Sequence, residues 1–358
     1  MNLLKEEPVF KTKMTELLGI KHPIMLAGMN WITTPELVAH VCNAGGLGML
    51  AVAQFSPDDT RKAIKEIRKL TDKPFGVNQI LIGPGAKENI QTAIEEKVPV
   101  INYALGKPWF IDQVHAYGGK VMGTTAIARH AVRAEQLGCD AVVITGREAA
   151  AHGAEATSLV LIPIVANHVK IPVIAAGGFH DGRGLAAALA LGASGISMGT
   201  RFMMTKECRL HDNFKQLCLQ ATEQDTVYSN RFDGMDGRAL KSKASLELMR
   251  KGFPMAEATS AAMEIKQLLK LSWWQFIGLS FKMMSAEEGS PLWVLARQAV
   301  AAKRSLLAIE KGDTEKGFLF AGQDCGAIDD VPSVKEVIDR IIAQAEQTLE
   351  ATRQKIVK

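Results

Sequence analysis

The chain has 358 residues, of which 47% are hydrophobic, so it is long enough to bury a large core. Its formal net charge is +4, and its lysines and arginines are scattered, which excludes the clustered basic surface of a typical nucleic-acid-binding protein. The five cysteines form no CxxC pair, and neither a signal peptide nor a membrane-spanning apolar run is recognisable, so we expect a cytoplasmic protein with reduced thiols.

Eight short apolar runs follow one another along the first part of the chain and predict eight strands. Most of them are continuously apolar, as expected for strands buried on both faces of a parallel sheet. The runs are Pro23–Met29, Gly48–Ala53, Phe75–Ile82, Val98–Leu105, Lys120–Thr125, Ala141–Gly146, Pro172–Gly178 and Gly195–Phe202.

Segments of helical length separate these runs. The segment Thr34–Ala44 has Pro35 just inside its start and Gly45-Gly46 beyond its end, which are ordinary helix start and stop signals. Eight strands alternating with helices predict an α/β fold, the parallel (β/α)8 TIM barrel. A doubly wound sheet is the main alternative, but the first predicted strand is not followed by the GxGxxG turn that usually opens such a sheet.

Beyond the eighth predicted strand the pattern changes to long helical stretches, among them Ala256–Leu269. We therefore predict a barrel over residues 12–210, completed by about residues 320–358, and a helical insertion subdomain over residues 211–319. Trp273 and Trp274 lie in the insertion. Burial between helices is the first interpretation of this pair, and a wall for substrate or for a homodimer is the second.

Glycines at the ends of the seventh and eighth predicted strands indicate a phosphate site. Gly177 and Gly178 follow the seventh strand, and Gly199 and Thr200 lie in the eighth run. Barrels commonly hold phosphate in these two loops, where glycines allow close approach and backbone N–H groups donate to the anion. The alternative is a pair of tight turns with no ligand.

The loop after the sixth predicted strand contains Glu148 and His152. A histidine at the carboxyl end of a barrel strand can act as a base near neutral pH, although a packing or capping role is the alternative. Glu148 can equally be a carboxylate at a helix start. His180, beside the glycine turn, is the second choice for a base.

Asn78 is a polar residue within the third predicted strand, and it needs a partner there. A ligand edge with donors and acceptors would serve, and a satisfied core contact is the alternative. Asn102 invites the same argument more weakly. No HExxH motif or carboxylate cluster has metal-binding spacing, so we predict no catalytic metal.

As an ordered set, these motifs resemble the nitronate monooxygenase family, formerly the 2-nitropropane dioxygenases. The family also contains NADH:quinone reductases and enoyl-acyl-carrier-protein reductase II. The resemblance covers roughly residues 12–210 and returns near residue 321. Its motifs are Pro23–Met29, Asn43–Gly48, Phe75–Asn78, Gly146–His152, Ala176–Gly178, Asp181–Gly184 and Met198–Phe202.

The resemblance implies FMN bound by the barrel. It implies that His152 is catalytic and that the cofactor is contacted by a set of residues from several loops. The loop departs from the usual family sequence at Ala150 and Ala151, which stand where glycines are frequent before the histidine. The implied cofactor-binding residues are Ala27, Gly28, Met29, Asn78, Glu148, Ala151, Gly177, Gly178, Gly199, Thr200 and Gln323.

The resemblance implies an FMN-dependent oxidoreductase that oxidises nitronates with oxygen. The alternative within the family is a reductase that uses NAD(P)H and acts on quinones or enoyl thioesters. Some quinone-reductase relatives have a lysine at the end of strand five, where this chain has Thr124 and Thr125. A flavin-free barrel of the inosine-monophosphate dehydrogenase type is a further alternative, but no cysteine is well placed to be its nucleophile.

Overall fold

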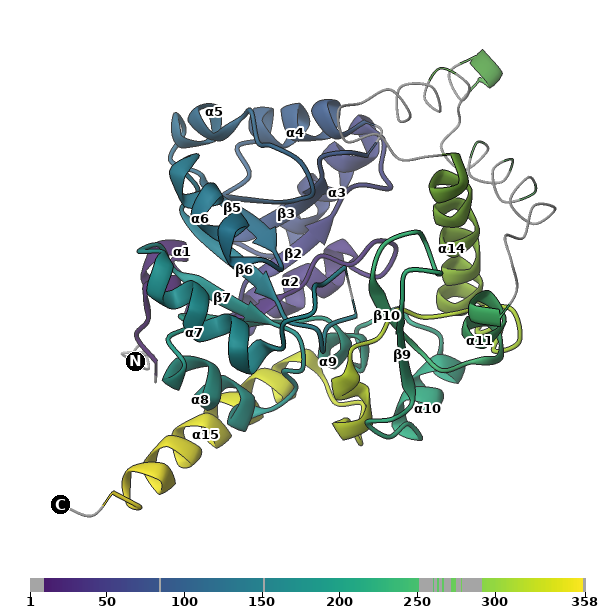
Figure 1. Cartoon of the computed structure of the whole chain (residues 1–358). Helices are drawn as coiled ribbons and strands as arrows, with labels where there is room; N and C mark the ends of the chain where they lie inside the picture. The colour runs from purple at the N-terminus through teal and green to yellow at the C-terminus, as the bar shows by residue number, and fades with distance from the viewer. Residues whose placement is uncertain are drawn as a thin grey trace.

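Eight parallel strands form a barrel in the computed structural model of the chain (Figure 1). The structure describes residues 10–83, 85–150, 152–250, 260, 263, 266, 272–274, 278 and 292–356. Each strand lies within one of the eight predicted runs. The strands are β1 (Ile24–Leu26), β2 (Gly48–Ala51), β3 (Phe75–Ile80), β4 (Val100–Ala104), β5 (Lys120–Thr125), β6 (Ala141–Thr145), β7 (Val173–Ala176) and β8 (Gly195–Met198).

Backbone hydrogen bonds close the barrel between its first two strands. The sheet runs continuously from β2 through β3 to β8 and then to β1. Leu47, just before β2, donates its N–H to the carbonyl of Ile24 at 2.9 Å and accepts from the N–H of Leu26 at 2.9 Å. The predicted (β/α)8 barrel is therefore confirmed, and the carboxyl ends of all eight strands face the same side.

Helices cover the outside of the barrel because each has one apolar face. In α3, for example, the Ser56 hydroxyl accepts from the N–H of Asp59, and Ile64 and Ile67 are buried. The helices that follow strands are α2 (Pro35–Asn43), α3 (Pro57–Leu70), α4 (Ala86–Glu95), α5 (Ile111–His115), α6 (Ala128–Gln136), α7 (Ser158–His168), α8 (Gly182–Ala190) and α9 (Thr200–Met203).

A helix was expected between the sixth and seventh strands, but no bounds for α7 were predicted from the sequence. Its sequence is apolar nearly throughout, and Leu159 is 69% exposed although the helix also buries Leu161 and Ile162. An apolar run with no clear periodicity does not indicate a helix from the sequence alone. Pro163 lies inside the helix and weakens the signal further.

The barrel interior is filled by side chains from alternate positions of the strands, with Met49, Met122 and Ile174 among them. The short helix α1 (Lys13–Leu18) adds Met14 and Leu18 to the same cluster. The interior is therefore a packed core rather than a channel. We therefore expect binding and catalytic residues in the loops at the strand ends.

The segment predicted to be an insertion, residues 211–319, which we call the insertion, contains helices and also a two-stranded sheet that was not predicted from the sequence. Strands β9 (Thr226–Ser229) and β10 (Gly237–Leu240) pair as an antiparallel hairpin. In Figure 1 this hairpin lies to one side of the barrel with three helices of the insertion. They are α10 (Asp212–Leu219), α11 (Lys243–Arg250) and α14 (Leu292–Lys311).

Phenylalanines form the core of the insertion. Phe232 and Phe318 are fully buried, and their rings stack with centroids 5.5 Å apart. Trp273 and Trp274 are instead 55% and 83% exposed, so the interpretation of this pair as core is wrong. The helix expected over Ala256–Leu269 lies outside the described residues except at positions 260, 263 and 266.

The chain returns to the barrel after the insertion. The one-turn helix η1 (Gln323–Ala327) is followed by α15 (Val334–Arg353), which begins with a capping box between Ser333 and Glu336. Helix α15 packs against α8 (Figure 1). Among the described residues, the structure contains no helix with the length and apolarity needed to cross a membrane.

Candidate functional site

Nearly all of the residues singled out from the sequence lie at the carboxyl ends of barrel strands, a face that we call the mouth. Gly177 and Gly178 follow β7, and Gly199 follows β8. The other described members are Ala27, Gly28 and Met29 after β1, Asn78 in β3, Glu148 and His152 after β6, and Thr200 in α9. Ala151 lies outside the described residues.

The turn after β7 has a backbone that favours glycine. Gly177 has φ +103° and Gly178 has φ +81°, a region that other residues rarely adopt. A Cβ at Gly177 would lie 3.1 Å from the backbone nitrogen of Ala149, so the two loops approach closely. Within the described part of the chain, the N–H groups of Gly177 and Gly178 donate to no other group.

Two helices begin near this turn, and only one of them has a side-chain cap. The carboxylate of Asp181 accepts from the N–H groups of Arg183 and Gly184 at the start of α8. Helix α9, which begins after Gly199, has no side-chain cap. Its first N–H groups are therefore available to an anion beside the glycine turn.

The hydroxyl of Thr200 has protein partners. It accepts from the N–H of Gly322 at 2.9 Å and donates to the carboxyl group of Asp324. Asp324 is buried, and this burial raises its pKa to about 7. Thr200 therefore connects the turn after β8 to η1, a contact that the sequence analysis did not foresee.

A row of polar side chains crosses the mouth at the ends of three neighbouring strands. The amide of Asn102 donates to the Oδ1 of Asn78 at 2.7 Å and to the hydroxyl of Thr124 at 2.9 Å. Gly28 lies against this row, because a Cβ there would be 2.6 Å from the Cβ of Asn78. Asn78 and Asn102 thus satisfy part of each other's hydrogen bonding and leave further groups for a ligand.

Glu148 caps α7. Its carboxylate accepts from the backbone N–H of Ser158 at 2.9 Å and from the Ser158 hydroxyl at 3.0 Å. Its carbonyl accepts from the N–H of Gln323 at 2.8 Å, while the Gln323 side chain donates to the carbonyl of Glu223. The hydrogen bonds of the Glu148 and Gln323 side chains are therefore not made to the glycine turns.

His152 forms a close pair with an aspartate of the insertion. Its Nε2 lies 2.7 Å from the Oδ2 of Asp233, whose residue is 6% exposed. The His152 ring also lies beside Phe320, with centroids 6.3 Å apart. Asp233 was missed from the sequence because it lies 81 positions from the histidine, with no motif joining them.

The hairpin fixes the loop that carries His152. Arg238 of β10 donates its backbone N–H to the carbonyl of Ala150 at 2.9 Å, and its guanidinium donates to the carbonyl of Arg147 at 3.1 Å. The guanidinium groups of Arg147 and Arg238 both lie over the ring of Tyr228 in β9, at 4.7 and 5.5 Å from its centroid. The insertion is therefore bonded to the loop after β6 on both sides of Glu148.

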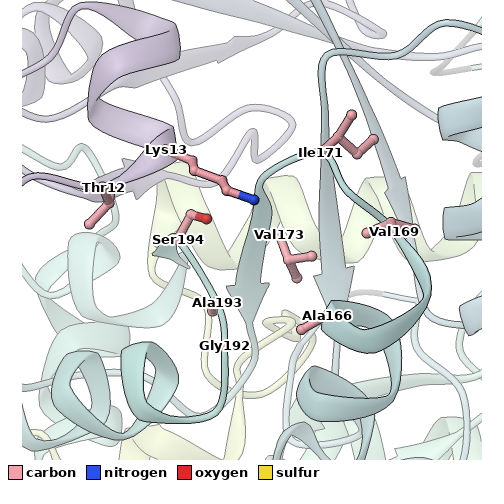
Figure 2. Close-up of a pocket in the computed structure, with 9 residues that line it drawn as sticks. All are labelled: Thr12, Lys13, Ala166, Val169, Ile171, Val173, Gly192, Ala193 and Ser194. Carbon is pink, nitrogen blue, oxygen red and sulfur yellow. The ribbon is translucent and has the colours of Figure 1, made fainter.

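A pocket of about 250 Å³ lies at the opposite face of the barrel, where β7 and β8 begin. Figure 2 shows Lys13 extending over it toward β7. Its lining contains none of the residues singled out from the sequence. Among the described residues, no three His, Cys, Asp or Glu side chains gather as a metal site would require.

The mouth has the parts that a flavin with a phosphate tail would need. The glycine turn after β7 and the uncapped start of α9 offer N–H donors to a phosphate. The row from Asn78 to Thr124 offers donors and acceptors to the polar edge of a ring. His152 lies on the same face with a buried carboxylate behind it, so an acid–base group is present as well.

Comparison with known proteins gives matches over almost the whole chain. The model of a family described as nitronate monooxygenase matches residues 11–344. A (3aS,4S,5R,7aS)-5-hydroxy-7a-methyl-1-oxo-octahydro-1H-indene-4-carboxyl-CoA dehydrogenase of Rhodococcus jostii is 38% identical, over 95% of this chain and 97% of its own. A probable nitronate monooxygenase of Staphylococcus saprophyticus is 32% identical, over 65% of this chain and 79% of its own.

A solved structure extends the comparison to three dimensions. FabK from Thermotoga maritima superposes with a TM-score of 0.78 at 36% sequence identity, and the match covers 97% of this chain and all of that one. The similarity therefore includes the insertion as well as the barrel.

Proposed function

Because the chain belongs to the nitronate monooxygenase family of flavin-dependent oxidoreductases, we propose that it is an FMN-dependent enzyme that oxidises nitronates with molecular oxygen. The resemblance drawn from the sequence motifs is confirmed by the family match. The proposal rests on one observation. A glycine-rich anion site, beside a helix start that has no side-chain cap, lies at the same barrel mouth as a histidine.

FMN would be held at both of its ends. Gly177, Gly178 and Gly199 would bind the phosphate through backbone N–H groups, and Thr200 of α9, which accepts from the N–H of Gly322, would support them. The ring would lie near Gly28 and the polar row that includes Asn78. When bound, FMN supplies the electron-accepting chemistry, and the protein supplies orientation and proton transfer.

His152 would face the substrate. A nitronate is an anion, so a histidine that donates a hydrogen bond to its oxygen would bind and orient it. The apolar ring of Phe320 beside His152 would exclude water from one side of the substrate. Thr124 is neutral, so at that position the chain places no fixed positive charge next to the reduced cofactor.

A second function has a specific observation in its favour. The Rhodococcus relative that matches over nearly its full length is a CoA-ester dehydrogenase. The alternative is therefore oxidation or reduction of an acyl thioester, with NAD(P)H as a possible partner for the flavin. His152 would then exchange a proton at a carbon beside the thioester carbonyl.

Anaerobic mixing distinguishes the two functions. The purified flavoprotein is mixed separately with propionate 3-nitronate, NADH, NADPH and a saturated acyl-CoA, and the flavin absorbance is followed. The proposal predicts rapid bleaching by the nitronate and reoxidation when oxygen is admitted. Bleaching by NAD(P)H or by the acyl-CoA, with none by the nitronate, would contradict the proposal and support the thioester reaction.

A further inference from the structure

Asp324 is a buried acid beside the turn that follows β8. Its residue is 9% exposed, and its carboxyl group is hydrogen-bonded to the hydroxyl of Thr200 at the start of α9. Gly322 lies against both groups, because a Cβ there would overlap Oδ1 of Asp324 and lie 3.1 Å from the hydroxyl oxygen of Thr200. The carboxyl group and the hydroxyl are therefore held against each other by the backbone of η1.

The hydroxyl of Thr200 has one hydrogen and two lone pairs with which to form hydrogen bonds. One lone pair accepts from the N–H of Gly322 at 2.9 Å. An ionised Asp324 only accepts, so in that state the hydrogen of Thr200 must point to the carboxylate. A protonated Asp324 can instead donate to the second lone pair of Thr200. The hydrogen of Thr200 is then free to bond to a different acceptor.

The groups around Asp324 allow both of its forms near neutral pH. Burial raises the pKa of Asp324 to about 7, and the carboxylate of Glu148 in the loop after β6 acts in the same direction. The guanidinium of Arg201 on α9 acts in the opposite direction. The thiols of Cys218 on α10 and Cys325 in η1 also face the carboxyl group. Burial raises the pKa of both thiols, so both stay neutral in this pH range.

We propose that Asp324 is a positioning residue that sets the direction of the Thr200 hydroxyl and so couples binding of the cofactor phosphate to uptake of one proton from solvent. This inference rests on the proposed function, in which the phosphate lies beside Gly199 and Thr200. With the proton on Asp324, the hydroxyl of Thr200 donates to a phosphate oxygen. Without it, the hydroxyl donates to Asp324, and a second negative charge lies close to the phosphate. Both effects weaken phosphate binding when Asp324 ionises.

The test measures the protons taken up when the apoprotein is titrated with FMN. Calorimetry at pH 7.5 in buffers of different ionisation enthalpy gives the number of protons taken up for each FMN bound. The phosphate of free FMN is mainly a dianion at this pH, and riboflavin is the control ligand because it has no phosphate. Wild type is expected to take up about half a proton or more with FMN and none with riboflavin.

Asp324→Asn tests whether Asp324 is the group that takes up the proton. The amide can donate to the Thr200 hydroxyl but has no charge at any pH, so this variant is expected to bind FMN without proton uptake. The ratio of the wild-type Kd to the variant Kd should rise about tenfold between pH 6 and pH 9, the effect of one pKa unit. Asp329→Asn is the matched control and should behave as wild type, because Asp329 is exposed in the same segment and has the same charge.

Two variants at Thr200 test whether the hydroxyl transmits the effect. Thr200→Ser keeps the hydroxyl and is expected to retain the proton uptake. Thr200→Val removes it and is expected to lose both the uptake and the tenfold change in Kd. Undiminished uptake in Asp324→Asn or in Thr200→Val would overturn the proposal. If Thr200→Val does not fold, the comparison of wild type with Asp324→Asn and Thr200→Ser decides, and loss of uptake in Thr200→Ser would contradict the hydroxyl's role.

Failure of this inference and failure of the proposed function give different results. Equal affinities of the wild-type apoprotein for FMN and riboflavin would refute the phosphate site itself. A clear preference for FMN with no proton uptake in wild type would leave the phosphate site in place and overturn the role of Asp324.

Discussion

At the scale of single residues, the proposed cofactor site depends on backbone geometry that only certain residues tolerate. The glycines after β7 were identifiable from the sequence because their residue type and position carry the signal. The partners of His152 and Thr200 were not, because Asp233 and Asp324 reach them from distant segments. A hydrogen bond between residues far apart in the chain leaves no local pattern.

Gly178→Ala is expected to weaken FMN binding at least tenfold. The left-handed backbone at φ +81° resists a side chain, and relaxation would move the N–H groups that face the phosphate. Gly118→Ala is the control, since Gly118 has φ +83°, with open space around it. Both variants should lose roughly 1 kcal/mol of folding free energy. FMN titration of the apoprotein measures the difference, and equal affinities in the two variants would refute it.

Asp324→Asn is expected to stabilise the protein in alkaline but not in acidic buffer. Burial raises the folded pKa of Asp324 from 3.8 to about 7, so the folded chain keeps a proton that the unfolded chain has already lost. The stability from this group is complete below the unfolded pKa and is lost as pH rises through about 7.

Urea unfolding at pH 5 and pH 8 measures this effect. Wild type should lose about 3 kcal/mol relative to Asp324→Asn between the two pH values. Because other titrating groups are shared, they cancel in the comparison. A difference between variant and wild type that does not change with pH would show that Asp324 is not the responsible group.

At the scale of elements, the β6 loop and α7 form one unit. Glu148 caps α7 through Ser158, and β10 bonds the loop through Arg238. The sequence indicated the loop through its motif, but it gave no bounds for α7 and did not indicate the hairpin. The helix is apolar without periodicity, and the hairpin strands have four residues each, which is too short for a reliable alternation.

Glu148→Ala is expected to lower the free energy of unfolding of the apoprotein by about 1 kcal/mol, the usual contribution of a helix cap. Glu155→Ala is the control, because the Glu155 side chain is 80% exposed and its pair with Arg147 should contribute little. Urea unfolding compares the two variants. Unchanged stability together with loss of FMN would instead assign the Glu148 carboxylate to direct cofactor binding, as the family resemblance implies.

At the scale of the whole molecule, the barrel was predictable and its connection to the insertion was not. Eight apolar runs, most of them continuous as in strands buried on both faces, leave few folds other than a parallel barrel. The insertion reaches the mouth through Asp233 and Arg238, so it belongs to the same functional unit as the barrel. Its packing depends on aromatic contacts that no periodic pattern encodes.

The central claim is that the mouth binds FMN by its phosphate, and the most direct measurement is the affinity of the apoprotein for FMN and for riboflavin. Two or more charge-assisted hydrogen bonds of roughly 1.5 kcal/mol each would favour FMN by at least about 100-fold. That ratio is the predicted result, and it should fall in Gly178→Ala. Equal affinities for FMN and riboflavin in the wild type would contradict the account.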